Sequence, residues 1–428
     1  MTPRLIAYEL LIKAEKNGIF SNIALDKALA ECDLSELDKS LTAMLFYGVT
    51  ERKITLDHII SKLSSRPICD IDRNTLIAIR LGIYQLRFLD KIPAHAAINE
   101  TVELCSKKTK GFVNAILREY TRKSSTNVFS CDKSDFVKYL SVTYSVCEEL
   151  AKKLVDTFDK ELCEDILRGF DRKPETTVCV NTLKISRDEL TSKLSAEKTD
   201  FSQRGLYVKG AIRSLYGFDD GLFFVQDQAS QICVEVLDAK ENDTVIDVCA
   251  CPGSKTFGAA ITMNNKGKIY AFDLHENKLS LINSCAARLG IDIIEASAAD
   301  GRVFIPELEG VADRVLCDVP CSGFGVLAKK PELRYKKPKD SERLPGIQLD
   351  ILNNACKYVK RGGSLVYSTC TILPEENENN VKLFLASHPE FSLCEWNVGN
   401  INATDGMMTF YPHIHKTDGF FIAKLKRK

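Results

Sequence analysis

Apolar residues recur at helical spacing through the N-terminal part of the chain, where strand-like alternation is almost absent. The two clearest stripes are Ala7, Leu10, Leu11 and Ala14, and Leu76, Ile79, Ile83 and Leu86. Steps of i, i+3, i+4 and i+7 place apolar side chains on one face of a helix, and another helix must then cover that face. We therefore predict an all-α bundle over residues 1–124.

A polar run from Thr121 to Asp135 follows the bundle and has little to bury, so we predict a linker there. The next stretch contains a helical piece at 135–158. After it comes the β-branched run 176–186, which predicts a strand leading into a loop. These features predict a small α+β middle domain over residues 135–220.

Beyond Gly221, short β-rich runs alternate with helical segments. The runs are 244–248, 268–272, 292–297, 313–318 and 363–368. This alternation predicts a mostly parallel sheet with helices on both faces, an α/β Rossmann-like domain over residues 221–428. Ligands of such sheets bind beyond the carboxyl ends of the strands. The chain is thus predicted to be a multi-domain protein.

Composition narrows the possible partners and the compartment. The 428 residues contain 58 basic and 58 acidic side chains, so a polyanion would have to be held by a local basic surface. No apolar run reaches the roughly 18 residues that cross a bilayer. Glu9, Lys13 and Lys16 interrupt the first apolar stretch, which therefore lacks the core of a signal peptide. We expect a cytoplasmic protein whose sixteen scattered cysteines are mostly reduced and buried.

The strand at 244–248 leads into a turn of small residues, Cys-Ala-Cys-Pro-Gly-Ser-Lys-Thr at 249–256. Gly253 allows the backbone to approach a ligand closely, and Asp247 supplies an acceptor at the end of the strand. Asp273 ends the next strand, twenty residues after Gly253, which is the separation at which a carboxylate binds a ribose diol. These features predict an adenosine-type ligand.

The turn at 249–256 has three other possible interpretations. A phosphate-binding P-loop needs glycine at positions 249 and 254, where this chain has Cys249 and Ser254, so we reject it. A dinucleotide-binding GxGxxG motif is also missing. A purely structural turn stays open on this segment alone. Asp300 and Asp318 at the ends of two further strands favour a ligand, because they would extend an acidic rim along one edge of the sheet.

Two cysteines follow neighbouring predicted strands, Cys321 after 313–318 and Cys370 after 363–368. A thiolate is suited to add at C6 of a pyrimidine, and the addition makes C5 nucleophilic toward a methyl group. Asp318, with a raised pKa, is a candidate to donate a proton or hydrogen bond to the ring. Cys321 is the candidate that helps to expel the attacking sulfur after methyl transfer. Packing stays open for each cysteine alone, whereas no metal site is expected because no CxxC pair or neighbouring histidine is present.

Three segments resemble motifs of the RNA cytosine-5 methyltransferases that use S-adenosylmethionine: CACPGSKT at 249–256, DVPCSG at 318–323 and YSTCTILPEENE at 367–378. The chain is most similar to the bacterial members of that family that act on 16S ribosomal RNA. Its N-terminal bundle resembles the NusB-type RNA-binding domain. The segments VNTLKISRDEL at 180–190 and VQDQAS at 225–230 match the family's middle part and the entry to its catalytic domain.

The resemblance implies a class I methyltransferase domain and a role for each matching residue. The residues implied to line the methionine and adenosine portions of the cofactor are Cys249, Ala250, Cys251, Pro252, Gly253, Ser254 and Lys255. Asp273 would bind the ribose, Asp300 would lie near the adenine, and Asp318 would touch both cofactor and base. Cys370 is implied to be the nucleophile and Cys321 to aid product release.

This sequence departs from the family pattern in two places. Cys251 and Ser254 replace an alanine and a glycine, and because both are small the turn should survive. The other departures, at Cys179, Val146, Cys147 and Glu149, fall in the middle segment that is implied to face RNA. They bear on the choice of target nucleotide more than on the reaction.

The implied partner is 16S ribosomal RNA, either naked or in an early assembly intermediate, bound by a monomer without DNA or membrane. Lys and Arg are dense at 328–343, where Arg334 adjoins Tyr335, so backbone phosphates could bind close to the reacting base; a solvated loop is the alternative. Other functions considered are a non-catalytic RNA-binding assembly factor and a cytosine-C5 methyltransferase that acts on another RNA such as tRNA. An amino-group methyltransferase would carry a DPPY-type loop at 318–321 instead.

Overall fold

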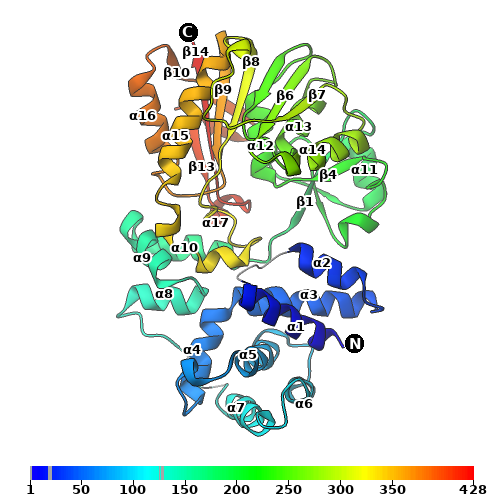
Figure 1. Ribbon diagram of the computed structural model, residues 1–428, viewed down its shortest axis with the longest axis vertical. Coiled ribbons are helices and arrows are strands. Elements are labelled where there is room, and N and C mark those ends of the chain that lie inside the picture. The colour runs from blue at the N-terminus through cyan, green and yellow to red at the C-terminus, as the bar shows by residue number, and fades with distance from the viewer. Residues whose placement is uncertain (1, 18–21, 125, 127–129) are drawn as a thin grey trace. The chain divides into compact units, whose positions relative to one another are not determined.

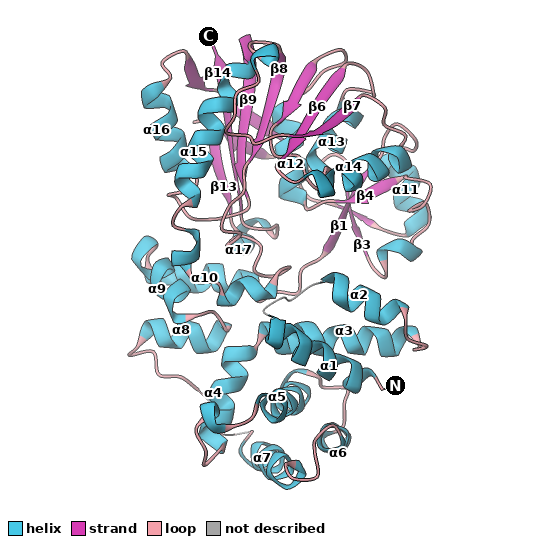
Figure 2. Ribbon diagram, viewed as in Figure 1, coloured by secondary structure: helices cyan, strands magenta, loops and turns pink. Residues whose placement is uncertain are grey.

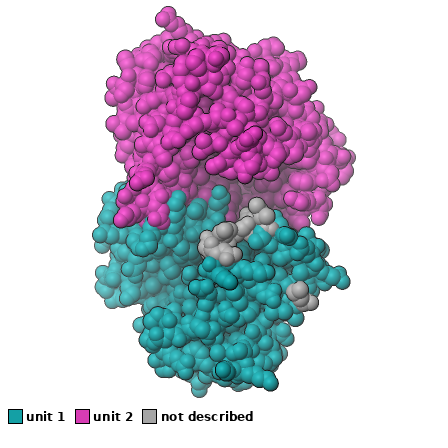
Figure 3. All heavy atoms as spheres, viewed as in Figure 1, with its two compact units in different colours: residues 1–167, 330–337 teal, residues 168–329, 338–428 magenta. Residues whose placement is uncertain are grey.

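The computed structural model describes residues 2–17, 22–124, 126 and 130–428. It divides into two compact units (Figure 3). The helical unit comprises residues 1–167 and 330–337, and the sheet unit comprises residues 168–329 and 338–428. The segment 135–220 is therefore shared between the two units. The three-domain division of the sequence stays a prediction.

The helical unit consists of α-helices and short 3₁₀ turns, as the apolar stripes predicted (Figure 2). Its helices are α1 (Pro3–Asn17), α2 (Asn22–Ala30), α3 (Glu36–Glu51), α4 (Lys53–Leu63), α5 (Arg73–Phe88), α6 (Ala94–Glu103), α7 (Lys110–Lys123), α8 (Phe136–Tyr144) and α9 (Glu148–Thr157). The next helix, α10 (Lys160–Phe170), continues into the sheet unit. Both predicted stripes face one apolar core: seven of their eight residues are buried, and Leu86 packs against them partly exposed.

The helical piece predicted at 135–158 is two helices, not one. Ser145 adopts a left-handed conformation, with φ of 53°, and ends α8 before α9 begins at Glu148. Asp135 caps the start of α8 by accepting a hydrogen bond from the backbone N–H of Lys138. Of the linker predicted at 121–135, the first three residues belong to α7, and residues 125 and 127–129 lie outside the described part of the chain.

The basic segment predicted to hold RNA phosphates belongs in part to the helical unit. Residues 330–337 contain the 3₁₀ helix η5 (Pro331–Tyr335), and the Arg334 side chain is fully buried, with Nη1 donating to the Tyr144 carbonyl at 2.6 Å. The Tyr335 hydroxyl donates to the Thr50 carbonyl at 2.5 Å. The phosphate-binding prediction is therefore wrong for Arg334 and Tyr335, because their polar groups are used within the helical unit.

The main sheet of the sheet unit has eight strands, in the order β10-β14-β9-β8-β5-β6-β7 with β13 added beside β14. The strands are β5 (Thr244–Asp247), β6 (Lys268–Asp273), β7 (Ile294–Ala298), β8 (Ala312–Asp318), β9 (Val359–Thr369), β10 (Phe391–Leu393), β13 (Met407–Phe410) and β14 (Phe420–Arg427). Strands β5 to β9 pair in parallel, and the pairs of β14 with β9, β10 and β13 are antiparallel. The five predicted strands are all present, and the mostly parallel sheet is confirmed.

Helices cover both faces of this sheet, as the strand–helix alternation predicted (Figure 1). One face packs against α12 (Gln228–Leu237), α13 (Ser254–Thr262) and α14 (Glu276–Leu289), and the other against α15 (Leu344–Ala355) and α16 (Glu378–Ser387). Successive residues of β8 show the alternation that this requires: Leu316 belongs to the first core, and Val315 and Cys317 belong to the second. Cys317 is therefore a packing residue of the second core.

A second, antiparallel sheet of four strands has the order β2-β3-β1-β4. Its strands are β1 (Thr176–Val180), β2 (Glu197–Lys198), β3 (Gly205–Val208) and β4 (Phe223–Val225), and helix α11 (Arg187–Leu194) packs on it. A hairpin of β11 (Trp396–Val398) and β12 (Ile401–Ala403) and the short helix α17 (Pro412–His415) complete the unit. The strand predicted at the start of 176–186 is confirmed as β1.

All sixteen cysteines are free thiols, but only six of them are fully buried, fewer than expected. Most of the others are partly exposed, and these include Cys321 and Cys370. Within the described ranges, no helix combines the length and apolar character needed to cross a membrane.

Candidate active site

The four predicted aspartates lie at the carboxyl edge of the parallel part of the main sheet. Asp247, Asp273 and Asp318 are the last residues of β5, β6 and β8, and Asp300 follows the end of β7 by two residues. These strands are neighbours in the order β8-β5-β6-β7, so the edge carries a continuous acidic rim.

The turn after β5 is shaped by Gly253, which has φ of +104° and precedes α13. A Cβ atom there would lie 2.4 Å from the Phe257 ring, so the position requires glycine for both conformation and space. The free N–H groups at the start of α13 face away from the helix body, an arrangement suited to polar ligand groups.

Asp247 lies beneath this turn and is almost fully buried. Its carboxylate accepts hydrogen bonds from the Thr256 hydroxyl at 2.7 Å and the Cys249 backbone N–H at 3.3 Å. Burial raises the pKa of Asp247 to about 7; the hydrogen bond from Thr256 offsets part of the effect, and the negative charge of Asp318 adds to it. Asp247 therefore fixes the turn from below.

Asp273 and Asp300 are more accessible than Asp247. Asp273 accepts hydrogen bonds from the backbone N–H groups of Cys251, at 3.3 Å, and His275, at 3.0 Å. Asp300 is held by the Arg302 guanidinium through contacts of 2.6 and 2.9 Å, and these hydrogen bonds lower the pKa of the Asp300 carboxyl. An accessible carboxylate at the end of β6, together with the glycine turn, fits the ribose and adenosine portions of the expected cofactor.

The two candidate cysteines lie side by side. The Sγ atoms of Cys321 and Cys370 are 3.1 Å apart, and the backbone N–H of Cys370 donates to Cys321 Sγ at 3.3 Å. The pKa of the Cys321 thiol is raised well above its usual range, first by its hydrogen bond with Cys370 and then by burial. Either sulfur can be the donor in the contact between the two thiols.

Buried polar side chains hold the loop that carries Cys321. The Glu376 carboxylate accepts from the Ser322 backbone N–H at 2.9 Å and from Gln348 Nε2 at 2.8 Å. The same Gln348 amide donates to the Pro320 carbonyl at 3.0 Å. Both residues that flank Cys321 are therefore fixed.

Cys370 is fixed in a similar way from the following loop. Asn377 bonds to the Thr369 hydroxyl at 2.5 Å and donates to the Thr371 carbonyl at 3.0 Å. Glu376 and Asn377 lie in the YSTCTILPEENE segment, but sequence reasoning assigned them no role. Because both residues follow Cys370 within one motif, the sequence could have indicated that they support its loop. Nothing in the sequence indicated the contact of Gln348, which lies in α15.

Lys255 and Asp318 form an ion pair beside these loops. Lys255 Nζ lies 2.6 Å from Asp318 Oδ2, and the Ser368 hydroxyl donates to Asp318 Oδ1 at 2.7 Å. Burial alone would lower the pKa of Lys255, but Asp318 more than compensates and raises it. We expected Asp318 to donate to the ring. In the structure both of its oxygens accept hydrogen bonds, and the donor beside it is the Lys255 ammonium, which also lies over the Phe420 ring.

A Rossmann-like parallel sheet with a glycine turn after its first strand, an acidic rim and an adjoining thiol pair defines a class I methyltransferase domain. The profile of the family described as 16S rRNA methyltransferase RsmB/F matches residues 234–426, and that of the NusB family matches residues 1–122. The chain belongs to the family of ribosomal RNA small subunit methyltransferases B. The family, the fold class and the enzyme class predicted from the motifs are therefore confirmed.

Individual relatives cover nearly the whole chain. The "Probable ribosomal RNA small subunit methyltransferase B" of Bacillus subtilis is 37% identical over 99% of this chain and 98% of its own length. The Klebsiella pneumoniae "Ribosomal RNA small subunit methyltransferase B" is 31% identical over 92% of this chain and 91% of its own.

Solved structures show the same architecture. The crystal structure of PH0851 superposes with a TM-score of 0.81 at 28% identity, covering 100% of this chain and 99% of its own. NSun6 from Pyrococcus horikoshii, solved with SFG, matches with a TM-score of 0.59 at 26% identity over 66% of this chain and 98% of its own.

Proposed function

We propose that this methyltransferase transfers a methyl group from S-adenosylmethionine to C5 of a cytosine in 16S ribosomal RNA, with Cys370 as the nucleophile. The observation that carries the proposal is the 3.1 Å separation of Cys321 and Cys370 at the ends of neighbouring strands. Two thiols held this close by separate polar networks are more than a packing contact requires. The names of the relatives support ribosomal RNA of the small subunit as the substrate.

The cofactor would be held by the turn 249–255 and by Asp273, with Asp300 and Asp318 farther along the rim. SFG, an analogue of S-adenosylmethionine, is present in the related NSun6 structure and supports this assignment. The cofactor supplies an electrophilic methyl group. Gly253 lets the turn approach it closely, and Asp247 supports the turn through Thr256 and Cys249.

The reaction would begin with the Cys370 thiolate forming a bond to C6 of the cytosine. The electron pair of the C5=C6 bond then becomes available at C5, with density shared toward N3 and the ring carbonyl. The Lys255 ammonium is the donor placed to stabilise that density, and the Asp318 carboxylate can accept from the exocyclic amino group. C5 would then take the methyl group that the bound cofactor supplies, and the electron pair of the methyl–sulfur bond would stay on the cofactor sulfur.

Cys321 has a different task before and after this step. Before attack, its S–H donates to the Cys370 sulfur, and that hydrogen bond stabilises the thiolate. Once Cys370 is a neutral thioether on C6, the main cause of the raised pKa of Cys321 is gone, and the Cys321 proton can leave to solvent. The Cys321 thiolate can then take the proton from C5, which restores the C5=C6 bond and expels the Cys370 thiolate.

The test uses unmodified small-subunit rRNA and cofactor with a labelled methyl group. Wild type is expected to incorporate label and Cys370→Ala to incorporate none. Cys321→Ala should accumulate a protein–RNA adduct that survives denaturant, because proton removal from C5 is blocked. Cys394→Ala, which changes a partly exposed thiol outside the site, is the matched control and should behave as wild type. Equal labelling by all four proteins would refute the two-thiol mechanism.

Parallel assays decide the substrate. We propose free 16S rRNA or an early assembly intermediate as the partner, bound by a cytoplasmic monomer without membrane or DNA. Equal amounts of naked rRNA, assembled small subunits and tRNA should give label in the first only, or in the first two. Preferential labelling of tRNA would replace rRNA as the substrate and leave the chemistry intact, and sedimentation of the protein with and without RNA tests the monomer.

A further inference from the structure

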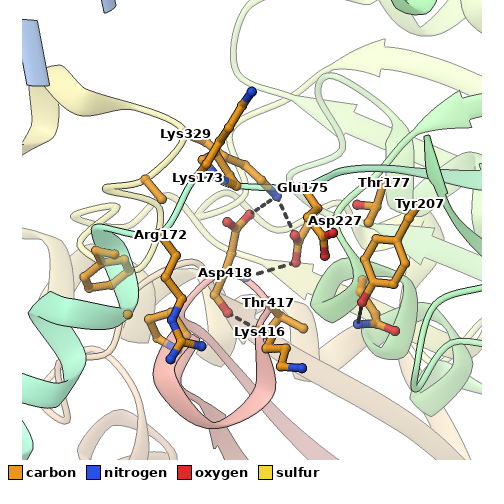
Figure 4. A pocket seen from close by; sticks show the side chains of 16 residues that line it. Arg172, Lys173, Glu175, Thr177, Tyr207, Asp227, Lys329, Lys416, Thr417 and Asp418 are labelled. Atoms are coloured by element: carbon orange, nitrogen blue, oxygen red, sulfur yellow. Dashed lines mark hydrogen bonds and ion pairs between the residues drawn. The ribbon is translucent and has the colours of Figure 1, made fainter. Parts of the chain in front are cut away.

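A cavity of about 240 Å³ lies in the sheet unit, between the main sheet's last loops and the small four-stranded sheet (Figure 4). The residues that carry its chemistry are Arg172, Lys173, Asp227, Lys329, Lys416 and Asp418. Four of these six side chains are cationic, in a chain whose overall charge is zero. The catalytic proposal uses none of them.

Buried charges form the inner wall of this cavity. Lys329 extends between two carboxylates: it forms an ion pair with Asp227 and lies 2.9 Å from Asp418 (Figure 4). Burial raises the pKa of Asp418 to about 7, and the nearby Asp227 charge adds to the effect. Asp227 also caps α12 through the Ala229 N–H. This wall is therefore rigid and charged.

The rim of the cavity is cationic and unpaired. Arg172, Lys173 and Lys416 are all exposed, and none of their side chains has an ion pair among the residues that the structure describes. Glu175 is the single acidic side chain on the rim. Exposed cations around a concave surface, without carboxylate partners, favour an anionic ligand that extends along the rim.

A second cavity, of about 390 Å³, shares walls with the first at Thr177, Lys329 and Asp418. It also reaches Ser254 of the cofactor turn and is lined by Gln226. The Gln226 side chain is only 4% exposed, yet neither its amide nitrogen nor its amide oxygen has a hydrogen-bond partner in the described structure. A buried amide with both groups unused is rare in folded proteins and indicates a ligand that supplies an acceptor and a donor.

A loop that lines both cavities is connected by backbone hydrogen bonds to the loops of the thiol pair. Asp418 precedes Gly419, whose N–H donates to the Gly325 carbonyl at 2.7 Å, and the Gly325 N–H donates to the Cys370 carbonyl at 3.0 Å. A Cβ on Gly325 would lie 1.9 Å from the Gly419 carbonyl oxygen, so these loops are in direct contact. On the other side, Ser254 immediately precedes Lys255. The loop that carries Asp418 is thus in backbone contact with the loops that carry the thiol pair.

We propose that these cavities hold the nucleotide next to the target cytidine in the RNA chain, an inference that rests on the proposed function. The phosphates on its two sides contact the cationic rim formed by Arg172, Lys173 and Lys416, and its base presents a donor and an acceptor to the Gln226 amide. Amide side chains pair with nucleobase edges in this way, and single-stranded RNA exposes those edges. Gln226 is then a specificity-determining residue for the flanking base.

The phosphate part is tested by RNA binding, which does not depend on methyl transfer. In a Cys370→Ala background, the triple variant Arg172→Gln, Lys173→Gln, Lys416→Gln should bind single-stranded 16S rRNA fragments about tenfold more weakly. Its affinity should also depend less steeply on salt. Lys382→Gln, which removes an exposed lysine of α16 outside the cavities, is the control and should bind as the parent does. Equal affinity and salt slope in the triple variant and the control would overturn the proposal.

The base part is tested with Gln226→Leu and RNAs that carry an abasic site at single positions around the target cytidine. An abasic site at one of the positions next to the target cytidine should raise the KM of the wild type about tenfold. The same site should leave the KM of Gln226→Leu unchanged, because the variant has already lost the contact with that base. The melting temperature of Gln226→Leu should not fall, since the lost amide had no protein partner. Abasic effects that are equal in both proteins would overturn the assignment of Gln226.

Two outcomes separate this inference from the proposed function. If the triple variant loses RNA affinity but the wild type methylates no RNA, the cavities bind RNA, but the catalytic proposal and the assignment of a neighbouring target cytidine both fail. If the wild type methylates rRNA and all cavity variants match the control, the subsite alone fails. Inorganic phosphate is titrated against the same proteins: loss of phosphate binding without loss of RNA binding would assign the cavity to a free anion and refute the nucleotide.

Discussion

Each unit of the molecule buries a cation, but the two cations are satisfied very differently. In the helical unit, Arg80 is 4% exposed and uses all its guanidinium nitrogens: Nε and Nη2 donate to Asp57 at 2.6 and 2.8 Å, and Nη1 donates to Glu15 at 2.5 Å. In the sheet unit, Lys255 is 11% exposed and forms one ion pair, with Asp318, which is itself 28% exposed. Arg80 thus makes three hydrogen bonds to two carboxylates, and Lys255 makes one to a single carboxylate.

The difference separates a structural charge from a functional one. The Arg80 network is closed in the sense that each guanidinium nitrogen is bonded to a carboxylate of the same unit, and it holds α1, α4 and α5 together. Lys255 retains hydrogen-bond donors next to the thiols and beneath a partly open rim. The Asp247 carboxylate is also buried without an ion-pair partner: its two hydrogen-bond donors, the Cys249 N–H and the Thr256 hydroxyl, are neutral. Unused donors beside a partly exposed carboxylate therefore distinguish Lys255 from Arg80.

Arg80→Met should have the largest effect on stability. The substitution leaves the carboxylates of Asp57 and Glu15 without their buried partner, so the free energy of unfolding should fall by about 3–5 kcal/mol. Chemical denaturation followed by circular dichroism measures the change. Lys39→Met, which removes an exposed i,i+3 pair with Glu36, should change stability by less than about 0.5 kcal/mol. A similar small loss in both variants would contradict the closed-network interpretation.

Asp247→Asn should remove a pH-dependent cost of folding. The folded pKa of Asp247, about 7, lies above the ordinary aspartate value of 3.8. Below about pH 4 the carboxyl is protonated in both states and costs nothing. As the pH rises toward 7, the unfolded chain ionises first and stability falls, by on the order of 4 kcal/mol.

The measurement is the free energy of unfolding of wild type and Asp247→Asn between about pH 4 and pH 8. The difference between the two proteins should change through this window and level off above it. Asp418, which titrates in the same direction, is present in both proteins and cancels. A pH-independent difference would show that Asp247 is not buried as a poorly compensated charge.

Lys255→Met should lower methyl transfer by about 10²-fold, since the donor that stabilises charge on the ring is lost. Stability should change little, because solvent can reach the Asp318 carboxylate that is left behind. Single-turnover methyl transfer and thermal unfolding are measured together, with Lys382→Met as the surface control. Unfolding of Lys255→Met, or full activity, would place Lys255 with Arg80 in the structural class.

The sequence was sufficient to predict features set by local pattern. Alternation after Gly221 predicted five strands of the main sheet, and aspartates and cysteines at strand ends could be placed on one edge because parallel strands share a direction. Gly253 was found for the same reason: a small-residue turn after a strand is a local feature. Pairings across long distances were not predictable, and these include the contact of Lys255 with Asp318 and of Gln348 with the Cys321 loop.

Charge density alone was misleading for the segment at 328–343. Basic residues there suggested phosphate contacts, but Arg334 is buried and Lys329 is held between Asp227 and Asp418. Composition counts charges and does not show which carboxylates or carbonyls meet them in the fold. The unpaired cations on the rim of the cavity come from two distant places in the sequence, Arg172 and Lys173 from one and Lys416 from the other, and the fold of the sheet unit places them around one cavity.

Tyr335→Phe should have the smallest effect, a loss of about 1–2 kcal/mol from the free energy of unfolding. The hydroxyl donates to the Thr50 carbonyl and accepts from the Lys53 N–H, and it also contacts the Ser145 hydroxyl at 3.1 Å, so several polar groups lose a partner at once. Tyr216→Phe, at a ring that is 53% exposed, is the matched control and should be neutral. Tyr335 lies in residues 330–337, which follow the Cys321 loop in sequence but belong to the helical unit. The substitution therefore measures how much this segment contributes to the stability of the helical unit. Equal stability of the two variants would mean that the hydrogen bonds of the Tyr335 hydroxyl contribute nothing to the free energy of unfolding.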